Sequence, residues 1–198
     1  MSSQTNTLTE GPLAKQIFLV SLPLALSNLL VARFYGARHP KDVEKTVHSA
    51  AIISAVAGVV LLLIGLLGSP AMLRLLNTKE DLLPGAILYL RVYFLGMPAL
   101  ALYNFGNAVF SAIGETKKPL YILSFAGVLN ILLNLFFVIV CSLDVAGVAL
   151  ASAISQCVSA GLILHALTRV QDCYALHFKE AKLDPAMTKS ILALGLPA

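Results

Sequence analysis

The sequence predicts an all-α membrane protein, a polytopic bundle of transmembrane helices. Of its 198 residues, 58% are hydrophobic and only 12% are charged, and the mean hydropathy is +0.85. Soluble domains carry about 25% charged residues, because their surfaces face water. The charges are also clustered, so that five long intervals contain no Asp, Glu, Lys or Arg: 16–32, 46–73, 92–114, 119–143 and 145–168.

The lengths of these intervals predict the number and positions of the membrane-spanning helices. They contain 17, 28, 23, 25 and 24 residues, and a helix needs about 20 mostly apolar residues to cross a bilayer. Lipid cannot satisfy the hydrogen bonds of an open strand, so each span is expected to be helical. We predict an N-terminal bundle over 15–168, with spans at about 17–32, 47–68, 85–112, 120–141 and 146–167.

The remaining segments are polar and orient the spans. A polar tail covers 1–14, and a polar cytoplasmic linker covers 169–189. The connections on one side, namely a basic loop at 33–45, the turn around 117–118 and the linker, hold ten Lys and Arg residues, whereas the other side holds Lys15, Arg74 and Lys79. Cytoplasmic loops carry the excess of cations. We therefore predict a multi-pass protein of the cell membrane (plasma or inner), and we attribute the pI near 9.0 to orientation rather than to nucleic-acid binding.

No motif predicts an enzyme, a cofactor or a metal site. The three cysteines form no C-x-x-C pair, and the four histidines are dispersed along the chain. His48 and His165 lie near the ends of spans, where an imidazole is expected to keep one edge in water. The chain also has no nucleophile elbow, phosphate loop or paired carboxylates, so the sequence favours transport or a structural role over catalysis.

Polar side chains within the spans are the candidates for a substrate or cation pathway. Several recur at helical spacing, so each set shares one face of its span, and one lies in the first span: Asn130 with Asn134, Asn104 with Asn107 and Ser111, Gln156 with Ser152 and Ser159, and Asn28. Such residues either join helices by hydrogen bonds or line a cavity for a cation or polar substrate. The sequence leaves both interpretations open.

Two prolines fall within the expected spans. Pro23 and Pro98 each remove a backbone donor, so each is expected to bend its helix. Transporters use such breaks for gating and for ion contacts.

Several segments resemble the multidrug and toxic compound extrusion (MATE) family of secondary transporters. They read KQIFLVSLPLALSNLL, VARFYGARHPKDVEKTVHSA, GETKKPL, LNILLNLFFV, DVAGVALASAISQCVS and LALGLPA, and they cover nearly the whole chain after the polar tail. The resemblance implies two six-helix bundles in the lipid bilayer and export of small organic, often cationic, compounds in exchange for H⁺ or Na⁺. Asn130 and Asn134 resemble a polar pair of the family's fifth helix that takes part in cation coupling in some members, although Asn134 cannot titrate.

Two departures from the family pattern add a further expectation. Leu30 runs directly into Val31 where family members have about 40 to 50 more residues, judged from two spans and their connection, and 190–198 resembles the start of the seventh helix. We therefore expect an incomplete MATE-type exporter that does not transport as this chain alone and that lacks its second six-helix bundle. The alternative is a non-transporting membrane remnant, or a module that associates with another bundle.

Overall fold

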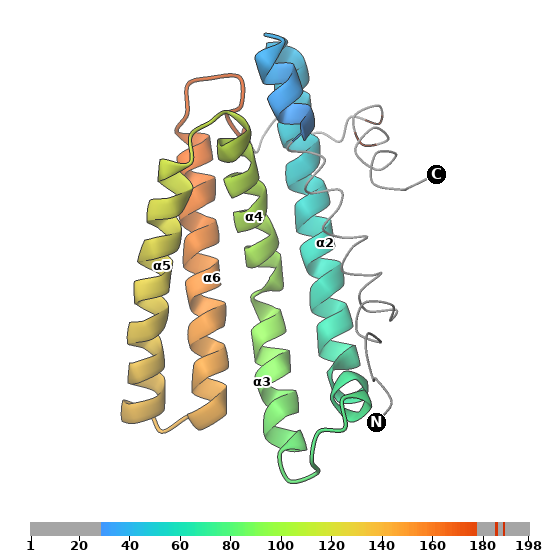
Figure 1. Cartoon of the computed structure of the whole chain (residues 1–198), viewed down its shortest axis with the longest axis vertical. Coiled ribbons are helices and arrows are strands. Elements are labelled where there is room, and N and C mark those ends of the chain that lie inside the picture. Colours follow the sequence, from blue (N-terminus) through green and yellow to red (C-terminus); the bar gives the residue numbers. More distant parts are fainter. Residues whose placement is uncertain (1–28, 178–184, 186–187, 189–198) are drawn as a thin grey trace, which may run out of the picture.

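The computed structural model describes residues 29–177, 185 and 188, and all regular structure in that part of the chain is helical (Figure 1). A helical segment at 29–36 is followed by five α-helices and one π-helix: α2 (Pro40–Leu75), α3 (Leu83–Leu95), α4 (Met97–Ala112), α5 (Lys117–Leu135), η1 (Phe136–Val140) and α6 (Asp144–Thr168). The predicted all-α class is confirmed.

The described helices include three that are long and apolar enough to cross a membrane. These are α2, the continuous pair of α5 and η1, and α6, and the number rises to four if the bent pair of α3 and α4 is taken as one span. These helices overlap the ranges predicted for spans at 47–68, 85–112, 120–141 and 146–167. Most of the span expected at 17–32, with Pro23 and Asn28, lies outside the described residues, as do the tail at 1–14 and the segment 190–198.

The predicted basic loop at 33–45 is wrong, because most of it is helical. The segment 29–36 stays helical through Arg33, and α2 begins at Pro40. Proline suits the first turn of a helix, and Asp42 in that turn complements the helix dipole. Charge marks where a chain leaves the hydrocarbon, but a helix can continue into water, so the charge-free intervals underestimate helix length.

The third span is bent by 44° where α3 meets α4 at Gly96. Pro98 lies in the first turn of α4 and cannot donate a hydrogen bond to the preceding turn. Pro70 lies inside α2, which continues past it to Leu75.

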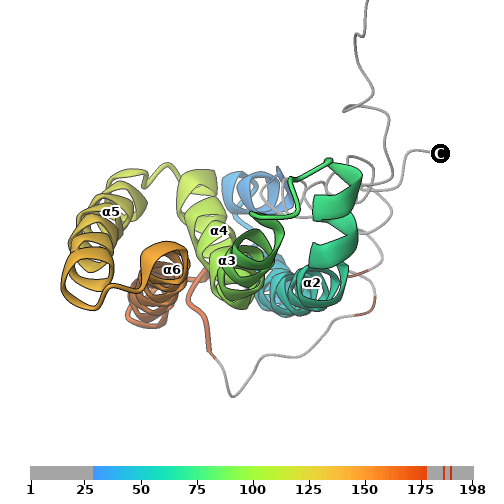
Figure 2. The same ribbon diagram turned by 90° about the horizontal axis from the view of Figure 1, so that it is seen from below.

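The helices pack around α6 and α2. Helix α6 contacts α3, α4 and α5, whereas α2 contacts α3 and α4 (Figure 2). The largest fully buried side chains include Phe105, Phe110 and Ile163. Glycines allow the closest approaches, since a Cβ built on Gly58 would lie 2.6 Å from the Cα of Pro98.

The first described part of the predicted linker folds back onto the bundle. Tyr174 and Leu176 are buried, and the Leu176 N–H donates to the Leu167 carbonyl at 3.2 Å. Burial raises the pKa of Tyr174 above its ordinary value, so this phenol keeps its proton to a higher pH than an exposed tyrosine does. The His177 N–H donates to Nε2 of His48 at 3.1 Å, and His48 is only 3% exposed. The expectation that His48 keeps an edge in water is therefore wrong, because this segment covers it.

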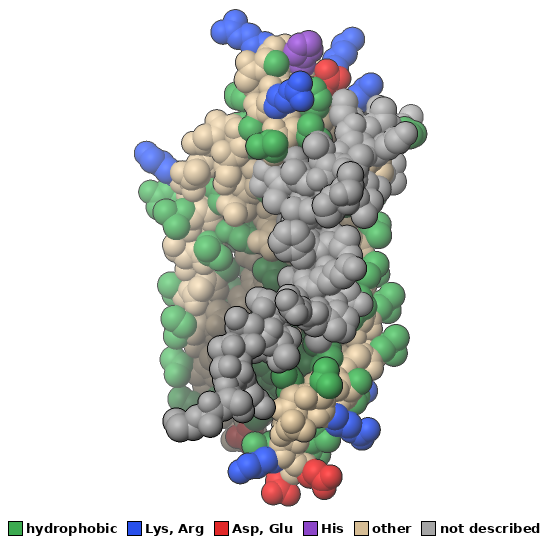
Figure 3. Space-filling model, turned by 45° about the vertical axis from the view of Figure 1, so that its right-hand side comes forward, with side chains coloured by type: hydrophobic (Ala, Val, Ile, Leu, Met, Phe, Trp, Pro, Cys, Tyr) green, Lys and Arg blue, Asp and Glu red, His purple; other side chains and the backbone are tan. Residues whose placement is uncertain are grey.

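Charged side chains gather at the two ends of the bundle, and the flanks between them are largely apolar (Figure 3). The end that holds the start of α5 and the close of α6 also holds seven of the ten described Lys and Arg residues. By the positive-inside rule we expect this end to face the cytoplasm. Helix α5 presents many exposed apolar side chains, including Leu123, Val128 and Ile131, as expected for a surface against lipid.

Candidate transport cavity

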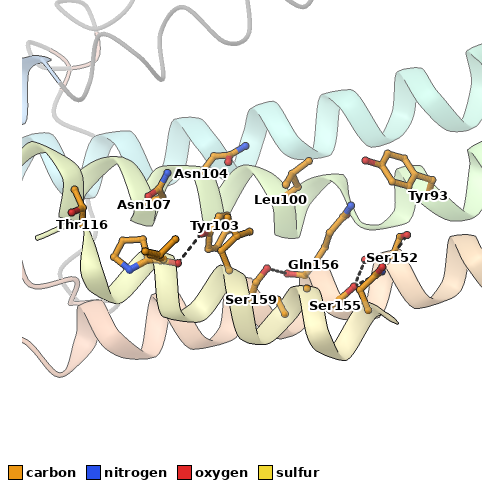
Figure 4. A pocket seen from close by; sticks show the side chains of 16 residues that line it. Tyr93, Leu100, Tyr103, Asn104, Asn107, Thr116, Ser152, Ser155, Gln156 and Ser159 are labelled. Carbon is orange, nitrogen blue, oxygen red and sulfur yellow. Dashed lines mark hydrogen bonds between the residues drawn. The ribbon is translucent and has the colours of Figure 1, made fainter. Parts of the chain in front are cut away.

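A cavity of about 760 Å³ lies between α4, α5 and α6. Helix α6 packs against both α4 and α5 and so forms the base, while α3 contributes Tyr93 (Figure 4). The lining is mostly hydroxyl, amide and aliphatic side chains: Tyr93, Leu100, Tyr103, Asn104, Asn107, Thr116, Pro119, Leu120, Leu123, Ala126, Gly127, Asn130, Ser152, Ser155, Gln156 and Ser159.

Four of the six residues predicted for a substrate or cation pathway line this cavity. They are Asn104, Asn107, Asn130 and Gln156. Asn134 lies one turn beyond Asn130 and is bonded to it, whereas Asn28 lies outside the described residues. Residues from three separate spans therefore converge on one space, but their role in transport remains a prediction.

Asn130 both joins two helices and lines the cavity. Its Nδ2 donates to the hydroxyl oxygens of Ser155, at 3.0 Å, and Ser152, at 3.4 Å. Asn134 Nδ2 in turn donates to Asn130 Oδ1 at 3.0 Å and to the Asn130 carbonyl at 2.9 Å. The sequence left open whether such residues join helices or line a cavity, and Asn130 does both.

Two buried amide oxygens lack a hydrogen-bond partner among the described residues. They are Oδ1 of Asn134 and Oε1 of Gln156. The Gln156 oxygen packs on Gly96 at the bend of the third span, where any Cβ would overlap it. A buried carbonyl oxygen without a donor is costly, so each is a candidate ligand for a cation or a donor group.

Tyr103 connects α4 to α5 beside the cavity. It is 5% exposed, and its hydroxyl donates to the Pro119 carbonyl at 3.1 Å. The short connection between these helices turns at Gly114, whose φ of +85° favours glycine. Tyr103 therefore sets the separation of α4 and α5 next to this turn.

Replacing Tyr103 with phenylalanine is expected to lower the free energy of unfolding by about 1 kcal/mol, because a buried hydrogen bond is lost without a change in shape. Thermal unfolding of the purified protein, followed by circular dichroism, measures the effect. Tyr121→Phe is the matched control, since Tyr121 is 71% exposed and should show no change. Equal effects of the two substitutions would contradict the hydrogen bond from Tyr103 to the Pro119 carbonyl.

The described lining of the cavity carries no formal charge. None of its lining residues is Asp, Glu, Lys, Arg or His, and no group of three or more His, Cys, Asp or Glu in the described part of the chain could hold a metal ion. Its chemistry is that of amide and hydroxyl dipoles and two tyrosine rings. Such groups bind a polar or cationic organic molecule through hydrogen bonds and ring faces.

Among the polar residues that line the cavity, sequence reasoning missed Tyr93, Tyr103, Thr116 and Ser155. Ser155 carries a detectable signal, since it lies three residues after Ser152 on the same helical face. Tyr93 and Thr116 carry none, because they reach the cavity only through the bend after α3 and the turn before α5.

The sequence profile of the MatE family matches residues 15–136. The chain belongs to the MATE family. One relative is the "Probable multidrug resistance protein YpnP" of Bacillus subtilis (strain 168), 36% identical over 132 residues, which are 66% of this chain and 29% of the relative. Another is the "Multidrug export protein MepA" of Staphylococcus aureus (strain NCTC 8325 / PS 47), 27% identical over 183 residues, which are 92% of this chain and 39% of the relative.

Solved MATE structures share the fold. An inward-facing conformation of a multidrug resistance MATE family transporter has a TM-score of 0.80 and 24% identity, covering 93% of this chain and 42% of that one. An outward-facing conformation of such a transporter also has a TM-score of 0.80, and the match covers 91% of this chain and 40% of that one. The chain thus spans well under half the length of these relatives. The MATE family is a transporter family, and this member is a multi-pass membrane protein.

Proposed function

We propose that the cavity between α4, α5 and α6 forms part of the route by which a MATE-type exporter moves small organic, often cationic, compounds across the cell membrane. The cavity itself carries the proposal. Its 760 Å³ lies within the usual range for small-molecule sites, about 300–1,000 Å³, and it is lined by aromatic rings and uncharged polar groups. The names of the relatives, multidrug resistance and multidrug export proteins, support export rather than catalysis.

The proposed exporter is an antiporter driven by H⁺ or Na⁺, and it works by alternating access. In that mechanism one bundle rocks against another around a shared site. The relatives are more than twice as long as this chain, so we expect a second six-helix bundle to complete the route in the intact transporter.

The polar pair on α5 supports Na⁺ over H⁺ as the ion bound beside this cavity. A proton carrier must titrate, and neither Asn130 nor Asn134 can. The unpartnered Oδ1 of Asn134 is a hard oxygen of the kind that suits a hard cation such as Na⁺. The hydroxyls of Ser152 and Ser155 lie within hydrogen-bond distance of the neighbouring Asn130.

Replacing Asn134 with leucine is expected to remove the Na⁺ dependence of ligand binding, with at least a tenfold loss of the Na⁺ effect, because the oxygen that would hold the ion is gone. Asn134→Asp is expected to keep it and to add a pH dependence, since a buried carboxyl has a raised pKa and titrates nearer neutrality. Binding of ethidium would be measured in NaCl and in choline chloride. Ser111→Ala, on α4 outside the cavity lining, is the control. A wild-type affinity that ignores Na⁺ would contradict this part of the proposal.

The proposed route is tested by saturable binding of tetraphenylphosphonium to the purified chain, together with ethidium efflux from cells that express it. Saturable binding supports the route whether or not this chain exports by itself. Absence of binding would favour the alternative of a non-transporting membrane module.

A further inference from the structure

A second cavity, which we call the basic pocket, lies at the cytoplasmic end between the start of α5 and the close of α6. It measures about 400 Å³, and its polar lining comes from Lys118, Arg169, Gln171, Asp172 and Tyr174. Among the described residues, it shares none with the transport cavity. Two cations from different helices thus face one small space at the level where the bundle leaves the hydrocarbon.

The lining of the basic pocket carries a net positive charge. Lys118 pairs with Glu115 at 2.8 Å, and the Asp172 carboxylate accepts the backbone N–H of Cys173 at 2.7 Å. No described carboxylate forms an ion pair with Arg169. The lining itself holds two cations, Lys118 and Arg169, and one carboxylate, Asp172, which leave a net charge of +1. This charge matches one phosphodiester.

The surface of α5 next to the pocket is apolar. Tyr121, Phe125 and Leu132 follow Lys118 at intervals of 3, 7 and 14 residues, so they continue its face of the helix toward the membrane centre. Their exposed fractions are 71%, 57% and 58%. A tyrosine just inside a cationic end is typical of the interface between headgroups and acyl chains.

We propose that the basic pocket binds the phosphate of an anionic phospholipid from the cytoplasmic leaflet, with an acyl chain lying along Tyr121, Phe125 and Leu132 of α5. Arg169 donates in a planar fork that suits phosphate oxygens, and Lys118 supplies a second positive charge. The apolar stripe distinguishes a lipid from free phosphate, because only the lipid gains from covering it. The lipid also ties the start of α5 to the close of α6.

The absence of tryptophan from the chain allows a direct test. Tyr121→Trp places a single fluorophore beside the pocket, and phosphatidylcholine vesicles would contain brominated phosphatidylglycerol or brominated phosphatidylcholine as the quencher. We expect phosphatidylglycerol to bind at least about fivefold more tightly, the gain of one cation near the surface. Arg169→Gln with Lys118→Gln should abolish this preference, whereas Arg169→Lys should retain part of it.

Arg33→Gln is the matched control, because it removes a cation from the same end of the bundle but outside the pocket. It should leave the preference unchanged. If Arg33→Gln and the double variant lost the preference for phosphatidylglycerol equally, the preference would reflect only the general surface potential. That result would overturn the proposed lipid site. Displacement of phosphatidylglycerol by millimolar inorganic phosphate would assign the pocket to a free anion and overturn the lipid. Unchanged circular dichroism of each variant establishes that the comparisons concern folded protein.

Discussion

Replacing Gly58 with leucine is expected to lower the free energy of unfolding of the bundle by about 3 kcal/mol, the upper part of the range for overpacked cores. A Cβ at this position would lie 2.6 Å from the Cα of Pro98 and 3.0 Å from the Cβ of Ala101. Because the nearer contact is backbone, no side-chain rotation relieves it, and α2 must move away from α4. Thermal unfolding in detergent, followed by circular dichroism, measures the loss.

Gly161→Leu is the matched control for Gly58→Leu. Gly161 also lies within a long helix, α6, but no atom lies within 4 Å of a Cβ built on it. Its substitution should leave the unfolding temperature unchanged or slightly higher, since leucine has the better helix propensity. Similar destabilisation at both positions would show that α2 and α4 do not meet closely at Gly58.

Replacing Gly127 with phenylalanine is expected to reduce the binding of organic cations at least tenfold with little effect on stability. Gly127 lines the transport cavity, and no atom lies within 4 Å of a Cβ built there. The phenyl ring is therefore accommodated by the protein but occupies space that a ligand would need. Equilibrium binding of tetraphenylphosphonium to the purified variant measures the effect.

Gly161→Phe serves as the control for the cavity-filling substitution. It adds the same ring at another open position, on α6, that does not line the cavity. Binding should therefore match the wild type. Tight binding by Gly127→Phe would place the ligand elsewhere in the protein.

The fold class and the positions of four spans follow from the sequence, because the hydrocarbon thickness imposes a minimum length on apolar segments. Helix ends are less predictable. Residues 33–36 and 40–45 contain five charged side chains yet are helical, since backbone hydrogen bonds do not stop at the membrane surface. The return of Tyr174 and Leu176 to the core depends on a buried surface formed by distant helices, which local polarity does not reveal.

The candidate site, too, is only partly predictable from the sequence. Helical spacing places Asn130 and Asn134 on one face, and the structure brings that face against Ser152 and Ser155. Spacing alone cannot say which helices meet, because this depends on small residues such as Gly58 and Gly106 that allow close approach. Ser111 shares a face with Asn107 by spacing but does not line the cavity, because the cavity extends along only part of α4.

The measurement that tests the proposed route most directly is ligand protection of a cysteine placed in the cavity. Cys141, Cys157 and Cys173, which form no disulfide, would first be replaced with serine. Asn107→Cys, within the lining, and Ser111→Cys, one turn away and outside it, would then be labelled with N-ethylmaleimide. We predict that tetraphenylphosphonium slows labelling at position 107 at least fivefold and leaves position 111 unchanged. Equal labelling rates at position 107 with and without the ligand would contradict the account.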